Sequence, residues 1–497
     1  MHPRIAIIGG GFSGLFAAYM LERCLGTDID TVVFERGERL GGRIATCELG
    51  DTGVIYDSGA AEFYDVPGGL SPRAVIGLLG LTTREMTATP YFCFEGEVLR
   101  CEEDFHRVMG RTGVESLAGF WEIGTSLRKP SQFVAAGHPP DNHHPWLNRS
   151  FSEVLGMIED EKARRFTRIQ AHSDTATEPD LTTGLYGFDN LLIDHPNYVR
   201  GLFTIDGGNE RLIEALAGGV SSGVLLSSEV REVASRRDGS YEIVFGQNGT
   251  TRRFVADFVL VTPPPTQLAH VSWSPGSLDS AIKAHIEHHC YPTDYLRATI
   301  LFRERTWAEA FPESYFVSDR LGGVTVYDKT VPGDSDEAPI LSLLIAGKYA
   351  TELSREGDDR VLENALRALP MESGVDEKSV VAFEIDRWQN DLGVSRMPGG
   401  IPLLSLEDRH SPAKEHPRVF ILGDFLYDTT INGALDGAGF VIDSVCDMVC
   451  GGETNGVVEL LKAVKPSPEV PENAGAVCEP GETLPFVKRL RRRSGET

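Results

Sequence analysis

The N-terminal pattern of apolar and polar positions predicts a strand, a turn, a helix and a second strand. An apolar run over residues 4–8 is followed by a glycine-rich turn and then by an amphipathic stretch over residues 15–25. A second apolar run over residues 31–34 ends at Glu35. Short β-branched runs bounded by glycine are typical of buried strands, and the longer periodic stretch is typical of a helix. This alternation predicts an α/β fold.

The glycine turn predicts a dinucleotide site. Gly9 and Gly11 would let a phosphate approach the backbone at a helix N-terminus, and Gly14 would let the helix pack close to the sheet. Glu35 would accept hydrogen bonds from ribose hydroxyls. A glycine pattern alone is weak evidence for a dinucleotide site, but this one lies between a predicted strand and a predicted helix, and the second strand ends at the acidic residue Glu35. The predicted contacts are Gly9, Gly11, Phe12, Ser13, Gly14, Glu35 and Arg36.

The remaining pattern predicts two interleaved domains, as expected for a chain of 497 residues. Helices are expected over residues 72–79, 114–127, 152–169 and 360–369, and strands over 321–327 and 340–344. The composition after residue 451, rich in Pro, Glu, Gly and Lys, predicts a mostly disordered tail. We expect a cofactor domain from residues 1–70, 200–290 and 385–450, a substrate-binding or cap domain from residues 71–199 and 291–384, and a tail over 451–497.

Charge and cysteine content bear on which partners, metal sites and cellular compartment are expected for this protein. The net charge of −26 argues against nucleic acid or an anionic membrane as the main partner. Eight scattered cysteines lack zinc spacing, so no metal site is predicted. No apolar run approaches the length that spans a membrane, and the early glycine turn leaves no room for a signal peptide. We therefore expect a cytoplasmic protein with reduced thiols.

Two further motifs resemble those of the flavin amine oxidase superfamily. Residues 35–43, Glu-Arg-Gly-Glu-Arg-Leu-Gly-Gly-Arg, resemble its second glycine motif, which lies beside the FAD pyrophosphate. Residues 419–437 resemble its C-terminal signature, in which an Asp binds the ribityl chain and the next helix N-terminus faces the flavin pyrimidine. The resemblance covers nearly all of residues 4–447. It implies a Rossmann-like FAD domain, with a mainly parallel sheet and helices on both faces, interleaved with an α+β substrate-binding domain.

The resemblance also implies the residues that contact a noncovalently bound FAD. Residues 54–63 resemble the segment that passes close to the flavin ring, and Val230 matches a residue that contacts the adenine end through its backbone. Met397 stands where monoamine oxidases carry the cysteine that attaches the flavin, which excludes that covalent link. The residues assigned to FAD on this ground are Gly42, Arg43, Gly59, Ala60, Glu62, Val230, Pro263, Trp388, Gly423, Asp424, Asn432, Gly433 and Ala434.

Arg297, Trp388 and Thr430 are the candidates for the chemistry. Arg297 aligns with the family lysine that holds a water at flavin N5. An arginine can hold a water or bind a substrate carboxylate, but it cannot act as a base. Alternatively, Arg297 is a salt-bridged strand residue with a structural role. Trp388 matches the family tryptophan that packs on the flavin ring, and its structural alternative is an aromatic residue of the core. Thr430 and Pro398 stand where monoamine oxidases carry the two tyrosines of an aromatic cage, so the cage is absent.

The resemblance implies an oxidoreductase that removes a hydride from the carbon next to nitrogen of an amine or amino acid. O2 would reoxidise the flavin and give H2O2. Arg200 is a second candidate, beside Arg297, for binding a substrate carboxylate. A C–C desaturase, a porphyrinogen-oxidase-like enzyme and a catalytically silent flavoprotein stay open as alternatives, because the scaffold carries several chemistries. The partner is a small molecule, and the sequence does not decide between a monomer and a homodimer.

Overall fold

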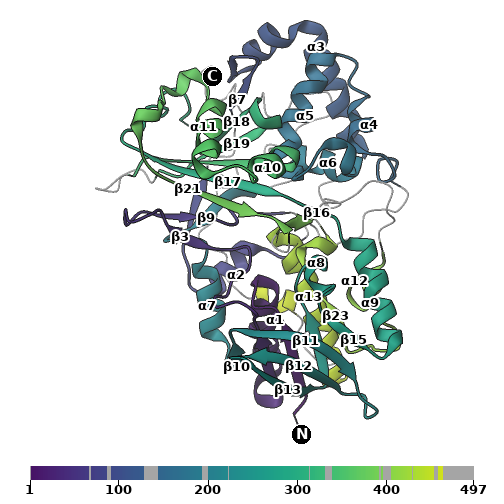
Figure 1. The fold of residues 1–497 in the computed structure, drawn as a ribbon. Coiled ribbons are helices and arrows are strands. Elements are labelled where there is room, and N and C mark those ends of the chain that lie inside the picture. The colour runs from purple at the N-terminus through teal and green to yellow at the C-terminus, as the bar shows by residue number, and fades with distance from the viewer. Residues whose placement is uncertain are drawn as a thin grey trace.

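Two β-sheets divide the protein into a lower and an upper part (Figure 1). Met397, Pro398 and nearly all of the expected tail lie outside the described residues. The computed structural model describes residues 2–66, 69–86, 91–127, 144–192, 200–221, 223–312, 314–330, 338–390, 393–395, 404–427, 429–452 and 457–462.

A five-stranded parallel sheet forms the centre of the lower part. Its apolar side chains alternate between two cores, so that Ile5 and Ile7 face one side while Ala6 and Ile8 face the other. Strands buried on both faces are almost entirely apolar, which explains the continuous apolar runs in the sequence. In spatial order the strands are β10 (Gly223–Leu225), β2 (Asp30–Phe34), β1 (Arg4–Ile8), β14 (Phe258–Val261) and β23 (Val419–Ile421).

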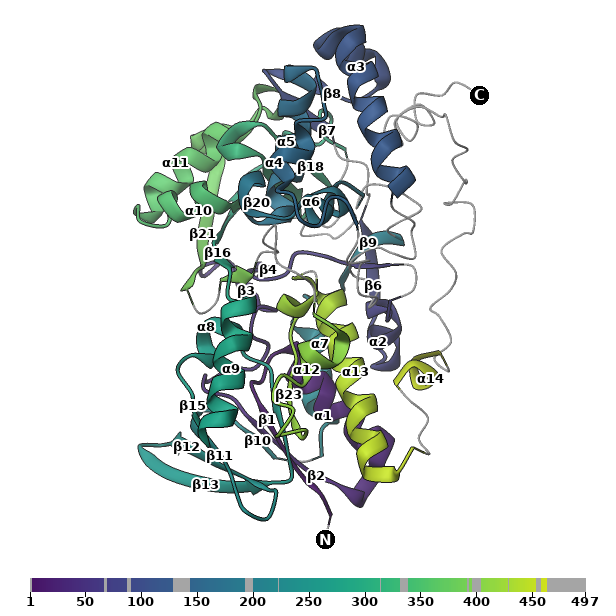
Figure 2. The ribbon, with the colours of Figure 1, turned by 90° about the vertical axis from the view of Figure 1, so that its right-hand side faces the viewer.

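The two faces of this sheet are covered differently. Helices α1 (Phe12–Leu25), α7 (Arg211–Gly219) and α13 (Ile431–Cys450) cover one face, and Figure 2 shows α1 beside α13. We expected helices on both faces, but the second face is covered mainly by another sheet, with α9 (Gly276–His289) beside it. The reason is the alternation of Tyr241, Ile243 and Phe245, which turns one face of that sheet inward. Its strands are β13 (Thr250–Ala256), β12 (Tyr241–Gln247), β11 (Ser228–Ser235) and β15 (Ser272–Ser274).

A seven-stranded mixed sheet forms the centre of the upper part. Helices α10 (Gly347–Leu353) and α11 (Asp358–Ala368) pack on one face of it. The other face meets a helical layer of α3 (Glu102–Leu127), α4 (Phe151–Leu155), α5 (Glu161–Thr175) and α6 (Gly184–Leu191). In spatial order the strands are β21 (Val380–Trp388), β17 (Tyr295–Phe302), β20 (Ile340–Ala346), β19 (Val324–Asp328), β18 (Tyr315–Ser318), β7 (Tyr91–Phe94) and β8 (Glu97–Leu99).

The helical layer differs from the sequence expectation at two points. The predicted helix over 152–169 is two helices. Helix α4 ends at Leu155 with Gly156 as its C-cap, and the Asp160 side chain caps a new helix, α5, by accepting a hydrogen bond from the Ala163 N–H at 2.8 Å. Helix α3 begins twelve residues before the predicted start at residue 114 and contains a kink at Gly110, where φ is 71°.

Short elements connect the two parts. A three-stranded antiparallel sheet joins chain segments that lie more than a hundred residues apart in the sequence. No helix among the described residues is long and apolar enough to cross a membrane. The remaining elements are β3 (Thr46–Glu48), β4 (Ile55–Asp57), β5 (Phe63–Asp65), α2 (Pro72–Leu78), β6 (Thr83–Met86), β9 (Arg200–Ile205), α8 (Pro265–Leu268), β16 (Pro292–Thr293), β22 (Val394–Ser395), α12 (Leu406–His410) and α14 (Val457–Lys462).

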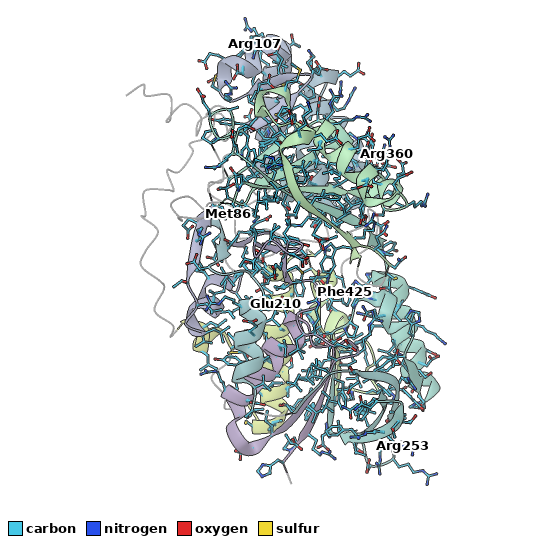
Figure 3. All side chains as sticks on the ribbon, turned by 60° about the vertical axis from the view of Figure 1, so that its left-hand side comes forward. Met86, Arg107, Glu210, Arg253, Arg360 and Phe425 are labelled. Atoms are coloured by element: carbon cyan, nitrogen blue, oxygen red, sulfur yellow. The ribbon has the colours of Figure 1, made fainter. Side chains whose placement is uncertain are left out.

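Two buried histidines, His285 and His410, and the partly exposed His289 pack behind the loop that follows β23. The ring of His289 lies 6.1 Å from the ring of Phe425, which Figure 3 labels near the boundary between the two parts. Burial lowers the pKa of His285 to about 3, of His289 to about 2 and of His410 to about 4. These side chains are therefore neutral in the folded protein at neutral pH, whereas unfolding lets them take up protons below pH ~6.5.

Acid is expected to destabilise the fold through these histidines. Above pH ~6.5 these histidines are neutral in both the folded and the unfolded chain, so they do not make the free energy of unfolding depend on pH. As the pH falls from there toward their folded pKa values, only the unfolded chain gains protons, and the free energy of unfolding decreases. His285→Leu should recover about 2 kcal/mol relative to wild type at about pH 4.5 and much less at neutral pH. Urea unfolding at both pH values measures this. His106→Gln, on an exposed residue of α3, is the control and should show no such difference. Equal effects of His285→Leu at both pH values would contradict the assignment.

Candidate active site

A cavity of about 370 Å³ lies at the carboxyl edge of the parallel sheet, between that sheet and the seven-stranded sheet. Both sheets contribute to its wall, together with the N-termini of α1 and α13. Ligands of open α/β sheets bind at this edge.

The N-terminus of α1 is open to the cavity. Gly9, with φ at 105°, and Gly14 make the tight turn, and a Cβ on Gly14 would lie 2.1 Å from the carbonyl oxygen of Gly9. A Cβ on Gly11 would meet only the Cα of Gly42, at 3.9 Å. Gly11 is the N-cap and has no side chain to cap the helix, and the first turn contains no acidic residue. The first backbone N–H groups of α1 can therefore bind an anion.

Glu35 organises the two glycine loops. Its Oε2 accepts a hydrogen bond from the Gly10 N–H, and its Oε1 accepts one from the Gly37 N–H, both at 2.7 Å. The Gly41 N–H in turn donates to the Gly10 carbonyl oxygen at 2.9 Å. Each carboxylate oxygen keeps a further acceptor position, so that Glu35 can also bind ligand hydroxyls from its place in the cavity wall.

An ion pair joins the second glycine loop to the C-terminal motif. The Arg43 guanidinium donates to the Asp424 carboxylate at 2.6 Å, and both residues line the cavity. The next helix, α13, begins at the cavity, where Thr430 is its N-cap and accepts a hydrogen bond from the Asn432 N–H at 3.2 Å. A second helix N-terminus therefore faces the same space.

These features fit a dinucleotide. One helix N-terminus is open for phosphate, a carboxylate can accept ribose hydroxyls, and a second helix N-terminus can stabilise negative charge. The residues present would hold such a group without a metal ligand set. Among the described residues, no cluster of His, Cys, Asp or Glu is arranged to bind a metal ion.

The seven-stranded sheet supplies the polar wall of the cavity. Alternation along β17 sends Leu296 and Ala298 into the apolar core, whereas Tyr295 and Arg297 line the cavity. Trp388 on β21 lies opposite Tyr295, and its indole N–H donates to the Ser58 carbonyl oxygen at 2.8 Å. The indole is thereby fixed against the segment that carries Gly59 and Ala60.

Arg297 is a buried cation with few partners. It is 3% exposed, and its Nη1 donates to the Asp57 carbonyl oxygen at 3.3 Å, while its Nε has no hydrogen-bond partner. Asp386 lies opposite it on β21, but its Oδ1 accepts from the Tyr56 hydroxyl and its Oδ2 has no hydrogen-bond partner, so that no hydrogen bond joins these two described residues. Burial raises the pKa of Asp386 to about 6, against the opposing effect of Arg297. A buried guanidinium without a bound carboxylate is costly, so the cavity favours an anionic ligand group at this point.

Glu62 and Tyr327 form a second polar contact in the wall. The Tyr327 hydroxyl donates to Oε1 of Glu62 at 3.0 Å, while Oε2 is buried and has no hydrogen-bond partner. Lys329 fixes the adjoining backbone, because its Nζ donates to the Ala61 carbonyl oxygen at 2.7 Å. Burial lowers the pKa of Lys329 and raises that of Tyr327 well above its usual value.

Most of the predicted site residues line the cavity. Gly14, Val230, Asn432 and Gly433 do not line it: Val230 packs in the core, and Asn432 is fully buried with an unpaired side-chain amide. The backbone of Arg200 lies on β9. The predicted residues in the wall are Gly9, Gly11, Phe12, Ser13, Glu35, Arg36, Gly42, Arg43, Gly59, Ala60, Glu62, Pro263, Arg297, Trp388, Gly423, Asp424, Thr430 and Ala434.

Sequence reasoning missed several side chains of the cavity wall, which come from the helical layer, from the inner strands of the seven-stranded sheet, and from β5 and α8. The alternation in residues 321–327 could have indicated Tyr327, and the register of Arg297 could have indicated Tyr295. No pattern in the sequence marked the two helical residues, Asp174 and Asn190. The main omissions are Tyr64, Asp174, Asn190, Gln267, Tyr295, Tyr327 and Leu344.

The glycine turn gives a direct test of this geometry. Gly14→Ala should destabilise the protein by about 3 kcal/mol, because its Cβ would collide with the Gly9 backbone. Gly11→Ala is the matched control in the same turn, and it should change stability by less than about 1 kcal/mol because its Cβ would make only an ordinary van der Waals contact with the Gly42 Cα at 3.9 Å. Urea unfolding of ligand-free protein measures both. Equal stabilities of the two variants would contradict the close contact of Gly14 with Gly9.

Comparisons with known proteins agree with this geometry. The sequence model of the family described as flavin containing amine oxidoreductase matches residues 12–438. The flavin-dependent L-tryptophan oxidase RebO of Lentzea aerocolonigenes is 24% identical, over 88% of this chain and 96% of RebO. Prenylcysteine oxidase 1 of Bos taurus is 26% identical, over 52% of this chain and 55% of its own length. The solved structure of cyclohexylamine oxidase from Brevibacterium oxydans has a TM-score of 0.69 at 17% identity, covering 90% of this chain and all of that one.

The open helix N-terminus, the paired glycine loops and a family match that spans most of the sequence lead to one conclusion. The chain belongs to the flavin-containing amine oxidoreductase family.

Proposed function

We propose that this protein is an FAD-dependent oxidase of a C–N bond, acting on an amino acid or amine. The FAD would be bound without a covalent link. Gly9, Gly11 and Arg43 would lie around its phosphates, Glu35 would accept its ribose hydroxyls, and Asp424 would accept hydroxyls of its ribityl chain. When bound, the flavin supplies a two-electron acceptor that takes a hydride from the carbon next to nitrogen and passes the electrons to O2, giving H2O2.

The buried and incompletely paired guanidinium of Arg297 carries the proposal. The cavity wall combines this cation with carboxylates and tyrosine hydroxyls, namely Glu62, Asp174, Tyr295 and Tyr327. Such a wall favours a small polar substrate over the lipophilic substrate of a C–C desaturase. The similarity to an L-tryptophan oxidase over nearly its whole length supports an amino acid over a simple amine.

Within this proposal, the protein binds and orients the substrate. Arg297 would bind the substrate carboxylate through two N–H donors, and Trp388 would form the apolar wall beside the flavin. Thr430 would keep the N-terminus of α13 aimed at the cavity through its cap. The burial of Arg297 and Tyr327 in the cavity wall would exclude water from the reacting carbon.

Reduction of the bound flavin tests the proposed function. The purified protein should be yellow, and acid denaturation should release all of its flavin as FAD. Anaerobic mixing with L- and D-amino acids, including L-tryptophan, and with amines such as cyclohexylamine and putrescine should bleach the flavin absorbance for one substrate class. The H2O2 formed on readmission of air is then measured. An FAD-loaded protein that none of these compounds reduces would contradict C–N oxidation.

Arg297→Met tests the role of the guanidinium. For an amino acid, kcat/KM should fall by about 100-fold, because a charge-assisted pair of hydrogen bonds is lost. For the corresponding amino acid amide, which lacks the carboxylate, the loss should be much smaller. Arg303→Met, on an exposed residue just after β17, is the matched control and should behave as wild type. Equal losses for acid and amide would assign Arg297 a role other than carboxylate binding.

A further inference from the structure

Glu62 presents an unused acceptor to the cavity. It lies between β4 and β5, in the segment that also contributes Gly59 and Ala60 to the wall. Its Oε1 is fixed by the hydroxyl of Tyr327, and its Oε2 is buried without a hydrogen-bond partner. A buried carboxylate oxygen with no donor is unfavourable, so this atom is suited to a donor brought by a ligand.

We infer that Glu62 binds the ammonium group of the substrate and accepts its proton before the C–H bond breaks. This inference rests on the C–N oxidation proposed above. It assigns Glu62 to the substrate, whereas the family resemblance had placed it with the cofactor. The nearby Arg297 would bind the carboxylate of the same amino acid, so that two opposite charges in the wall would match the two charges of a zwitterion.

The chemistry requires such an acceptor. An ammonium nitrogen has no lone pair, so it cannot form the C=N bond as the hydride leaves the neighbouring carbon. In the inferred step one N–H bond of the ammonium breaks and the proton moves to Oε2 of Glu62. The nitrogen lone pair then forms the C=N bond while the C–H electron pair leaves as hydride to the flavin. Glu62 returns the proton to solvent when the product departs.

The other polar groups near Glu62 are less suited to this role. Arg297 has no acceptor atom, and the Tyr295 hydroxyl donates to the Ser173 carbonyl oxygen. The Lys329 ammonium is already bound to the Ala61 carbonyl. Asp174 is the other carboxylate in this part of the wall. Among the described residues, Glu62 interacts electrostatically with Tyr295 on β17, Tyr327 on β19 and Lys329 after it. Arg297 on β17 and Asp174 on α5 act on the same two tyrosines, and Asp57 on β4 acts on Lys329.

Glu62→Gln tests the inference without removing the contact to Tyr327, because a glutamine oxygen still accepts that hydrogen bond. The rate of anaerobic flavin reduction is measured against pH, with L-phenylalanine if it reduces the wild type and otherwise with the amino acid that does. At neutral pH the variant should be about 100-fold slower than wild type. The difference should shrink to less than tenfold near pH ~10, where the free amino acid is itself largely deprotonated.

Binding provides an independent readout. The deaminated acid, 3-phenylpropionate in the case of phenylalanine, has the carboxylate but no ammonium, and its dissociation constant should be the same for the variant and the wild type. Glu115→Gln, on an exposed residue of α3, is the control for loss of a negative charge and should match wild type in every measurement. Asp174→Asn should keep the wild-type dependence of the rate on pH.

The outcomes separate this inference from the proposed function. If no amino acid or amine reduces the wild-type flavin, the proposed function fails and the role of Glu62 fails with it. Two results would overturn only the inference, provided that the wild-type flavin is reduced. In the first, the ratio of the wild-type rate to the Glu62→Gln rate is the same at every pH; in the second, Glu62→Gln loses its flavin. A pH-dependent defect that appears in Asp174→Asn instead would assign the ammonium to Asp174 and also overturn it.

Discussion

Close contacts between backbone segments hold the cavity together. A Cβ on Gly14 would lie 2.1 Å from the carbonyl oxygen of Gly9, and one on Gly59 would lie 2.1 Å from the carbonyl oxygen of Arg43. The Gly41 N–H donates to the Gly10 carbonyl oxygen. Side chains at these positions would separate the segments. This close approach keeps the N-terminus of α1 open to the cavity. It also allows the hydrogen bond of Glu35 and the ion pair of Arg43, because both of these join atoms on different loops.

The two faces of the seven-stranded sheet have different roles at β17: one packs in an apolar core and the other lines the cavity. One face of β17 belongs to an apolar core with α10 and α11, which fixes the strand. The opposite face carries Tyr295 and Arg297 toward the cavity. Apolar packing of the rest of the strand offsets the unfavourable desolvation free energy of the buried guanidinium. Arg297 can therefore remain incompletely paired, with donors left for a ligand.

Local patterns in the sequence predicted the part of the cavity wall at the edge of the parallel sheet better than the part that comes from the seven-stranded sheet and the helical layer. The glycine turn, Glu35 and the Gly423-Asp424 motif are short-range signals whose geometry follows from backbone sterics. The sheet that covers the second face of the parallel sheet was not predicted, because the alternation in β12 is equally compatible with any half-buried strand. Asp174 and Asn190 reach the cavity only through the packing of α5 and α6 on the sheet, which no local pattern encodes. The hydrogen bond between Tyr327 and Glu62 joins residues 265 positions apart, which no local pattern in the sequence encodes either.

The contact between Arg43 and Asp424 spans 381 residues of the chain. During synthesis on a ribosome, the N-terminal glycine loops emerge long before their acidic partner and before α13, which packs on α1. The parallel sheet also lacks its edge strand β23 until residue 421 has been made. The pocket is therefore completed only when nearly the whole polypeptide has left the exit tunnel, so that any ligand that needs the whole cavity can bind only late in the biogenesis of this protein.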